Sequence, residues 1–197
     1  MEFIKKNWGN ILMIAILALL FIPQTSKPIK VFVNRIFAFS PSEIKQENRN
    51  VLTDYNWRLK TLSSEEINLS KSKGKVIIIN FWATWCPPCI AEMPSFQKLY
   101  DDYGSRVDFY FVSSEEIEKL QKFIQTKGYT FPVYLQNSES PEMLQSNSLP
   151  TTYVISKEGE IIIKEFGSAD WNSDKTRKLL DELLNQFKVF QAVLVTL

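Results

Sequence analysis

The two cysteines of the chain, Cys86 and Cys89, are three positions apart and enclose two prolines. Residues at this spacing share one face of a helix, so the pair can close a disulfide if the motif begins a helix. Pro87 suits the first helical position, because its missing N–H would have no partner there. Cys86 would then lie at the helix N-terminus, where the macrodipole and free N–H groups favour a thiolate. We therefore expect Cys86 to attack a disulfide and the more buried Cys89 to resolve the resulting mixed disulfide.

The composition disfavours other chemistry at this motif. The 197 residues include no histidine, which excludes Ser-His-Asp and Cys-His catalysis and removes most ligands of a single-chain zinc site. Ile90 stands where covalent haem attachment needs a histidine. A purely structural bridge would close a very short loop and contribute only about 2 kcal/mol. With 23 Lys+Arg against 22 Asp+Glu, charge gives no reason to expect a nucleic-acid partner. These exclusions favour reversible redox chemistry without a metal or a dissociable cofactor.

The segments around the motif predict an α/β fold. Residues 75–81, KVIIINF, form a β-branched run typical of a central strand buried on both faces. The motif and a helix to residue 103 follow directly, with apolar residues at helical spacing. Parallel strands with crossover helices, followed by an antiparallel pair, predict a central mixed sheet covered by helices on both faces. The other predicted elements are a short N-terminal hairpin (55–59 and 67–69), a strand (107–112), a helix capped at 113–116 and stopped by Gly128, a strand (131–135), a hairpin (151–156 and 160–166) and a helix (174–187).

The N-terminus carries an apolar segment, residues 11–22, preceded by Lys5 and Lys6 and ended by Pro23. At 1.5 Å per residue it covers about 18 Å, well short of a hydrocarbon core of about 30 Å, so its length fits a signal peptide or a short membrane anchor. Residues 23–26 lack the small-residue pair of a signal-peptidase site, which favours an uncleaved anchor within residues 1–28. The flanking charges are nearly balanced and do not predict its orientation.

The segments on either side of the expected domain differ in character. Residues 29–50 are predicted to be a juxtamembrane amphipathic stretch followed by a polar linker. The soluble domain is expected over residues 51–188. Residues 189–197 form an uncharged apolar tail without an assigned role, and both an extra strand and an interface stay open for it.

The motif and its surroundings resemble a known family. The segment FWATWCPPC after a buried strand, with SLPTTYVI about sixty residues later, is similar to the thioredoxin superfamily and to its membrane-anchored TlpA/ResA-like branch. This resemblance covers roughly residues 51–187 and implies a thioredoxin-like fold. It also implies a cis peptide bond before Pro150, a proline that in this family packs beside the cysteine pair. The cis-proline would hold the preceding backbone open, so that an extended substrate segment can pair with it beside the disulfide. The substrate-binding residues that it implies are Trp85, Pro87, Leu149 and Pro150.

The resemblance also bears on proton transfer. Thioredoxins carry a buried aspartate six residues before the first cysteine, where this chain has Asn80, which cannot titrate. Glu92 lies three residues after Cys89, on the same helical face, where ResA-like proteins carry a glutamate. If Glu92 is partly buried, its pKa rises toward neutrality and suits it to shuttle a proton to or from Cys89. The alternative is a solvated glutamate on the helix surface. The aromatic residues interpreted as packing are Tyr153, Phe166 and Trp171.

The resemblance implies a thiol-disulfide oxidoreductase anchored in a bacterial membrane, with its domain on the periplasmic side. Its expected partners are cysteine-containing extracytoplasmic proteins, apocytochrome c among them, and a membrane electron donor that re-reduces the pair. A monomer is expected. Two alternatives stay open: a disulfide oxidase or isomerase, since the two prolines do not set the potential, and a binding module without turnover. Ala83 disfavours a peroxidase, because peroxiredoxins need Thr or Ser at that position.

Overall fold

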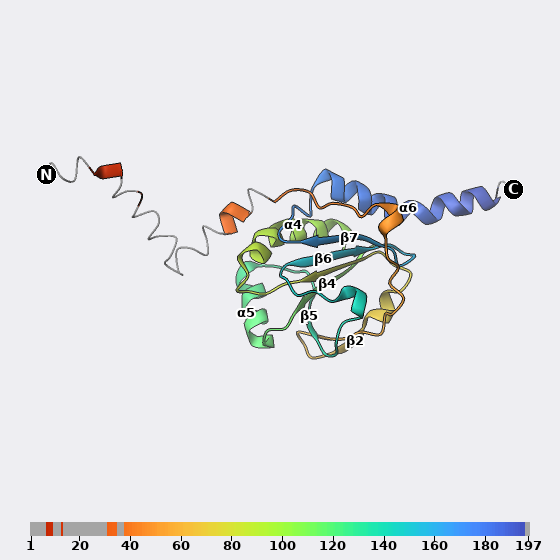
Figure 1. The fold of residues 1–197 in the computed structure, drawn as a ribbon. Coiled ribbons are helices and arrows are strands. Elements are labelled where there is room, and N and C mark those ends of the chain that lie inside the picture. The colour runs from red at the N-terminus through yellow and green to blue at the C-terminus, as the bar shows by residue number, and fades with distance from the viewer. Residues whose placement is uncertain (1–6, 10–12, 14–30, 35–37, 196–197) are drawn as a thin grey trace.

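The computed structural model describes residues 7–9, 13, 31–34 and 38–195, with the backbone alone for residues 186–195. In this part of the chain, one seven-stranded mixed sheet has the order β2-β1-β5-β4-β3-β6-β7 (Figure 1). The strands are β1 (Arg58–Thr61), β2 (Glu66–Asn68), β3 (Ile77–Phe81), β4 (Asp108–Ser113), β5 (Val133–Gln136), β6 (Thr151–Ile155) and β7 (Ile161–Phe166). The helices are α4 (Pro87–Tyr103), α5 (Ile117–Lys127) and α6 (Asp174–Val195), with the short 3-10 helices η1 (Gln46–Asn48), η2 (Leu69–Ser72) and η3 (Glu142–Leu144).

The strand β3 lies inside the sheet, and all of its residues are buried. It pairs in parallel with β4 and antiparallel with β6, which places Asn80 between Phe111 and Thr152. Beyond these neighbours, β5 pairs in parallel with β4, and β7 pairs antiparallel with β6. The continuous β-branched run therefore forms a central strand, and the predicted mixed sheet is confirmed.

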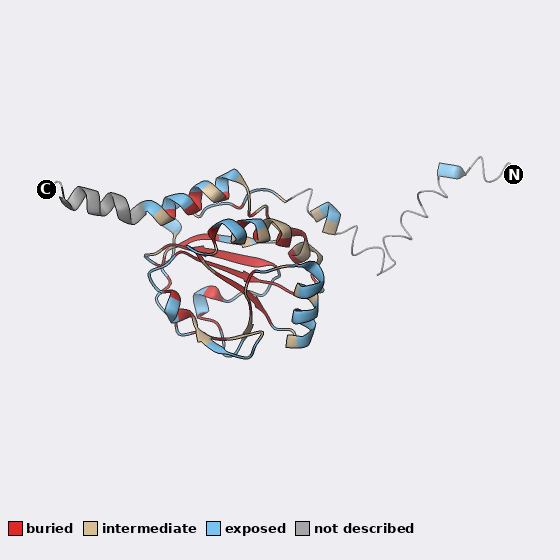
Figure 2. Ribbon diagram, turned by 180° about the vertical axis from the view of Figure 1, so that it is seen from behind, coloured by how far each residue is buried: buried red, intermediate tan, exposed pale blue. Residues whose placement is uncertain are grey.

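The three long helices of the described chain pack on one face of the sheet, so the expectation of helices on both faces holds only in part, because the other face carries just the short 3-10 helices η2 and η3. Met93 of α4, Leu120 of α5 and Leu180 of α6 belong to one buried cluster. The crossovers through α4 and α5 step across the sheet in the same direction, and right-handed connections then place both helices on the same side. Figure 2 shows buried residues along the strands and on parts of the helices. The other face is covered by residues 52–57, η2 and η3, which contribute Leu52, Tyr55, Trp57, Leu69 and Leu144.

At one edge of the sheet, β1 and β2 form an antiparallel pair in which Leu59 lies opposite Ile67. The strand β1 also pairs antiparallel with β5, so the pair extends the sheet past the parallel strands. Trp57, just before β1, is fully buried, and its indole N–H donates to the carbonyl of Ser138 (3.2 Å). This bond ties the start of β1 to the loop that follows β5.

At the opposite edge, residues 38–50 lie along β7, and we call this segment the strap. The backbone N–H of Ile44 donates to the carbonyl of Ile162 (2.8 Å), and that of Ile161 donates to the carbonyl of Asn50 (2.8 Å). Residues 40–50, predicted to be a polar linker, are thus attached to the domain. The strap covers backbone groups of an edge strand that would otherwise be open to pairing with another chain.

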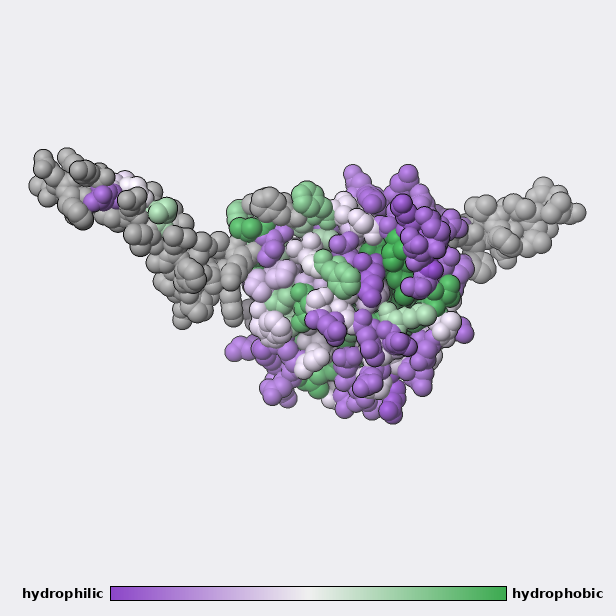
Figure 3. Space-filling view, viewed as in Figure 1, coloured by the Kyte–Doolittle hydropathy of each residue, from purple (hydrophilic) through white to green (hydrophobic). Residues whose placement is uncertain are grey.

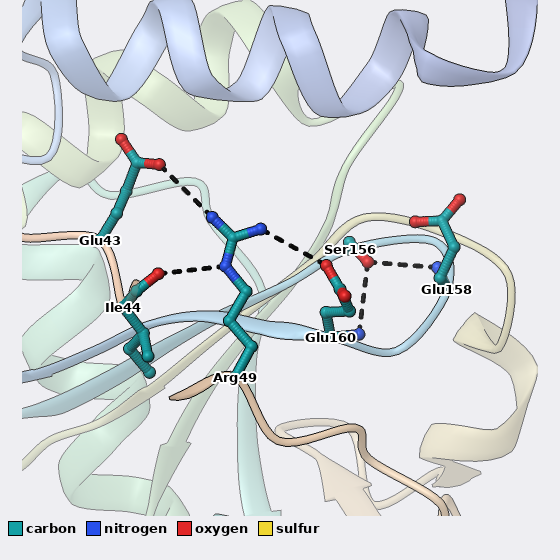
Figure 4. A network of polar contacts seen from close by, with 6 residues as sticks. All are labelled: Glu43, Ile44, Arg49, Ser156, Glu158 and Glu160. Atoms are coloured by element: carbon teal, nitrogen blue, oxygen red, sulfur yellow. Dashed lines mark hydrogen bonds and ion pairs between the residues drawn. The ribbon is translucent and has the colours of Figure 1, made fainter. Parts of the chain in front are cut away.

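Side chains fasten the strap as well. The guanidinium of Arg49 forms ion pairs with Glu160 (3.4 Å) and Glu43 (3.8 Å) and donates to the carbonyl of Ile44 (3.1 Å; Figure 4). Nearer its start, the carbonyl of Phe39 accepts from the backbone N–H of Asp170 (2.9 Å), in the loop between β7 and α6. The strap therefore contacts both the β6–β7 turn and the loop before α6.

The C-terminal helix α6 continues to Val195, well beyond its predicted end at residue 187. Residues 189–195 of the apolar tail are therefore helical, which excludes an extra strand there. The predicted anchor at residues 11–22 lies outside the described residues except for Met13. Among the residues that are described, no helix combines the length and the apolar character needed to cross a membrane. In the view of Figure 3, hydrophobic side chains are scattered among hydrophilic ones on the surface of the domain.

Candidate active site

The cysteine pair lies at the start of α4, directly after the loop that leaves β3. Cys86 is the N-cap of the helix, and Pro87 is at its first position, as predicted. The two sulfurs form a disulfide, with the Cα atoms 5.3 Å apart. The backbone N–H of Cys89 donates to Cys86 Sγ (3.3 Å). An N–H group of the first helical turn, which has no partner within the helix, can therefore stabilise a Cys86 thiolate once the pair is reduced.

The disulfide is buried, but the residues around it are not. Cys86 is 3% exposed and Cys89 is fully buried, so the expected difference in burial is small in the oxidised state. Trp85, next to Cys86, is 57% exposed, and Leu149 is 37% exposed. Phe166, at the end of β7, is also exposed, so its interpretation as a packing residue is wrong. Large apolar side chains therefore flank the cysteine motif and the Pro150 loop.

The loop between β3 and α4 is held by the carboxylate of Glu115, which lies between the end of β4 and the start of α5. The backbone N–H and the hydroxyl of Thr84 both donate to the carboxylate of Glu115. The distance from Thr84 Oγ1 to Glu115 Oε1 is 2.8 Å. Glu115 also forms an ion pair with Lys119 on α5. Burial alone would raise the pKa of Glu115, but the hydrogen bonds from Lys119 and Thr84 outweigh it, and the pKa is lowered. Glu115 is therefore a stable anion that fixes the loop before Cys86.

This contact replaces the capping arrangement expected at residues 113–116. The helix α5 begins at Ile117 with Glu116 as its N-cap, and no side chain caps it. The expectation of a capped start is therefore wrong, because Glu115 bonds the cysteine loop in place of its own helix. Sequence reasoning missed this role, since the partners Thr84 and Glu115 are 31 residues apart.

The Pro150 loop meets the cysteine motif at the same end of the sheet. The Leu149–Pro150 peptide bond is cis, as predicted, and Pro150 itself is buried. Thr151, the first residue of β6, pairs with Phe81, the last residue of β3. Hydroxyl groups stabilise the loop, because Thr151 Oγ1 donates to the carbonyl of Ser148 (2.9 Å). The register thus brings the start of β6 next to the strand that leads into Cys86.

A groove of about 350 Å³ opens beside this loop. Its wall comes from the ends of β3, β4 and β5 and from the segment before Pro150. Amide and hydroxyl side chains predominate, so it offers hydrogen bonds to a polar chain. Lining residues include Phe81, Ser114, Gln136, Gln145, Asn147 and Leu149.

Behind the cysteines, Glu92 is buried within the domain at 1% exposure. Its carboxylate accepts hydrogen bonds from Asn80 Nδ2 (2.8 Å), Trp171 Nε1 (2.9 Å) and the backbone N–H of Ala169 (3.3 Å). Burial raises the pKa of Glu92 to about 8, although the three hydrogen bonds act in the opposite direction. The alternative of a solvated surface glutamate is therefore excluded.

Two residues near Glu92 have roles beyond their sequence interpretation. Asn80, which cannot titrate, links the site to β6 by donating to both Glu92 and Thr152 Oγ1 (2.8 Å). Trp171, interpreted as a packing residue, does pack, with its ring stacked on Phe96 at 4.9 Å between centroids. Its hydrogen bond to Glu92 is an additional role for which the sequence carries no local signal. Tyr153 is fully buried, as its packing interpretation predicts.

A cysteine pair at the N-terminus of the helix after a central strand, with a cis-proline at the start of the neighbouring strand, defines a thioredoxin-like protein. Residues 54–164 match the sequence profile of the AhpC/TSA family, and the chain belongs to this thioredoxin-like family.

Named relatives point to the same class. The chain is 36% identical to the thioredoxin-like protein YneN of Bacillus subtilis over 127 residues, which cover 62% of this chain and 74% of YneN. It is 32% identical to the thiol-disulfide oxidoreductase ResA of Halalkalibacterium halodurans over 136 residues, 68% of this chain and 74% of ResA. The crystal structure of StoA from Bacillus subtilis superposes with a TM-score of 0.51 at 29% identity, covering 64% of this chain and 93% of StoA. Site and relatives thus agree on thiol-disulfide oxidoreduction as the class of chemistry.

Proposed function

We propose that the protein reduces disulfides of extracytoplasmic proteins through Cys86 and Cys89. The observation that supports this most is the position of Cys86 at the N-terminus of α4, with the N–H of Cys89 on its sulfur. A thiolate is the attacking form of cysteine, and this position stabilises it. Relatives named thiol-disulfide oxidoreductase ResA support the same activity.

The reaction transfers two electrons from the cysteine pair to the substrate. The Cys86 thiolate attacks one sulfur of the substrate disulfide, so that the substrate S–S bond breaks, a mixed disulfide forms and the other substrate sulfur leaves as a thiolate. Cys89 then loses its proton and attacks Cys86 Sγ. The second substrate sulfur leaves and takes up a proton, and the Cys86–Cys89 disulfide is formed. A dithiol of a membrane electron donor would reverse these steps and restore the reduced pair.

Glu92 is the proposed acceptor of the Cys89 proton. It lies one helical turn after Cys89 and is buried with it behind the motif. A general base acts best when its pKa lies near the working pH. Because burial raises the pKa of Glu92 to about 8, its proton can exchange near neutral pH.

Trp85, Pro87, Leu149 and Pro150 are the proposed substrate-binding residues. The exposed side chains of Trp85 and Leu149 flank the motif and can contact the apolar side chains of a substrate segment. The polar groove beside Leu149 can accept the backbone of the same segment after it passes the disulfide. Cysteine-containing proteins, apocytochrome c among them, are the proposed substrates.

Residues 1–28 are the proposed anchor in a bacterial membrane, with the domain of residues 51–188 on the periplasmic side and the chain a monomer. The strap would then follow the juxtamembrane stretch and join it to the edge of the sheet. In intact cells treated with a reductant, a membrane-impermeant maleimide should label Cys86. Labelling only after lysis would contradict this location.

Trapping of substrates tests the activity. The variant Cys89→Ser should accumulate mixed disulfides through Cys86 that a reductant releases, because the resolving thiol is missing. The matched variant Cys86→Ser should trap none. A non-catalytic binding module would give no mixed disulfide with either variant.

The reduction potential of the Cys86–Cys89 pair tests the direction. A reductant of extracytoplasmic proteins should have a potential well below about −200 mV, in the range of thioredoxin-type pairs. A value well above this would contradict the reducing role and favour a disulfide oxidase or isomerase.

A further inference from the structure

The carboxylate of Glu92 is surrounded by hydrogen-bond donors from two parts of the fold. Asn80 comes from β3, and Ala169 and Trp171 come from the loop between β7 and α6. A backbone N–H and an indole N–H can donate but cannot accept. A proton on Oε2 would therefore face two donors and no acceptor. These N–H groups favour the ionised form of Glu92, whereas burial favours the acid.

The charge that acts on Glu92 does not help these donors to stabilise the ionised carboxylate. Glu165 on β7 is the charged group whose field acts on Glu92, and it opposes ionisation. Cys89, on the same helix, is uncharged while the disulfide is closed. Neutral hydrogen-bond donors are therefore the groups that favour the ionised carboxylate among the described residues. Of the two donors from the β7–α6 loop, the indole N–H of Trp171 lowers the pKa of Glu92 more than the backbone N–H of Ala169 does.

The orientation of Trp171 is determined by α4, the helix that carries both Cys89 and Glu92. Its ring stacks on Phe96 at an angle of 11° between planes, and its backbone N–H donates to Ser95 Oγ (3.2 Å). The hydroxyl of Ser95 in turn donates to the backbone carbonyl of Glu92 (2.7 Å). The indole is fully buried, so its N–H cannot replace the hydrogen bond to Glu92 by one to water unless the core unpacks.

We infer that Trp171 is a positioning residue for the exchange reaction: its indole N–H holds the Glu92 carboxylate in the form that can take a proton from Cys89. This inference rests on the proposed role of Glu92. It adds that the β7–α6 loop, far from the motif in sequence, sets the pH at which the second step of the reaction proceeds.

The matched variants are Trp171→Phe and Trp57→Phe. Trp171→Phe keeps an aromatic ring on Phe96 and removes the N–H. Trp57→Phe removes an equally buried indole N–H from the other face of the sheet, where it bonds Ser138. If Trp171→Phe does not fold, incorporation of benzothienylalanine at position 171 keeps the indole shape and replaces only the N–H by sulfur.

The measurement uses the reduced full-length chain in detergent and an aromatic disulfide that releases a coloured thiolate. The first release reports attack by Cys86, and the second reports resolution by Cys89. In Trp171→Phe, the midpoint of the pH dependence of the second release should move upward by roughly one to two pH units, the effect of losing a hydrogen bond to a charged group. The first release should keep its pH dependence, and Trp57→Phe should leave both unchanged. An unshifted second release in Trp171→Phe, or in the benzothienylalanine protein, would overturn the inference.

The variant Glu92→Gln separates this inference from the function on which it rests. If Glu92→Gln leaves the second release unchanged, the proposed role of Glu92 is wrong and the inference falls with it. If Glu92→Gln removes the midpoint, the double variant Glu92→Gln/Trp171→Phe should behave as Glu92→Gln alone. An additional effect of the same size in the double variant would show that Trp171 acts by another route, and the inference alone would be rejected.

Discussion

The region behind α4 and the junction between the cysteine loop and α5 each hold a carboxylate, and the pKa values of the two are shifted in opposite directions. Glu92 is buried among neutral N–H donors, and burial raises its pKa to about 8. Burial also raises the pKa of Glu115, but this residue is only partly buried, and hydrogen bonds from Lys119 and Thr84 lower its pKa overall. Three neutral donors offset only part of the cost of fully burying Glu92, whereas an ammonium partner together with the two donors of Thr84 outweighs the smaller cost at Glu115. Glu92 can therefore exchange a proton near neutral pH, and Glu115 stays an anion that holds the loop before Cys86.

The largest expected effect is on the pH dependence of stability. The pKa of Glu92 rises on folding from an ordinary 4.5 to about 8, so the stability linked to its proton is present below pH 4.5 and is lost as the pH rises to about 8. That difference corresponds to roughly 5 kcal/mol. Urea unfolding of the natural chain should show the decline over this window, and Glu92→Gln should lack it. Parallel profiles of the two proteins would contradict the raised pKa.

A smaller effect is expected from removing the carboxylate of Glu115, whose pKa is lowered. Glu115→Ala removes the acceptor of both Thr84 donors and should lower the free energy of unfolding by about 2 kcal/mol at pH 7. The neighbouring Glu116 is exposed and caps no backbone group with its side chain, so Glu116→Ala is the control. Urea unfolding of the two variants should differ clearly. Equal losses would mean that the contact between Glu115 and Thr84 contributes nothing specific to the loop.

The smallest effect is expected from Lys119, whose ammonium group distinguishes the surroundings of Glu115 from those of Glu92. Lys119 is about half exposed, so Lys119→Met should lower the free energy of unfolding by only about 0.5 kcal/mol at pH 7. Because the pKa of Glu115 is lowered on folding, its stability is present above pH 4.5 and lost as the pH falls through the lower folded value. Lys119→Met should shrink this acid-side loss. An unchanged loss in acid would show that Thr84, rather than Lys119, lowers the pKa.

Features that depend on neighbouring residues were predicted well. The central strand follows from an unbroken β-branched run, and the cysteine pair at the start of α4 follows from its spacing and from Pro87. The cis bond before Pro150 followed from the family resemblance. Gly128 ends α5 in the left-handed conformation, as predicted, because a residue without Cβ adopts it at little cost.

Features that depend on which segments meet were missed. The polar residues 40–50 suggested a linker, but the backbone of Ile44 pairs with β7 through groups that carry no side-chain signal. Residues 113–116 suggested a capped helix start, but Glu115 bonds Thr84 on another loop. Helices were expected on both faces, but α4, α5 and α6 pack on one face, because the face depends on the direction in which the chain crosses the sheet.

The amino-acid sequence by itself determined where sulfur chemistry is placed, since i and i+3 spacing, the proline at the first helical position and the N-terminal N–H groups are all local. Only the tertiary structure decided how a proton reaches that chemistry. Glu92 and Trp171 are 79 residues apart in the chain, and their hydrogen bond exists because α4 and the β7–α6 loop pack together. The proton affinity of a carboxylate depends on the solvent and dipoles around it, and these are determined by packing.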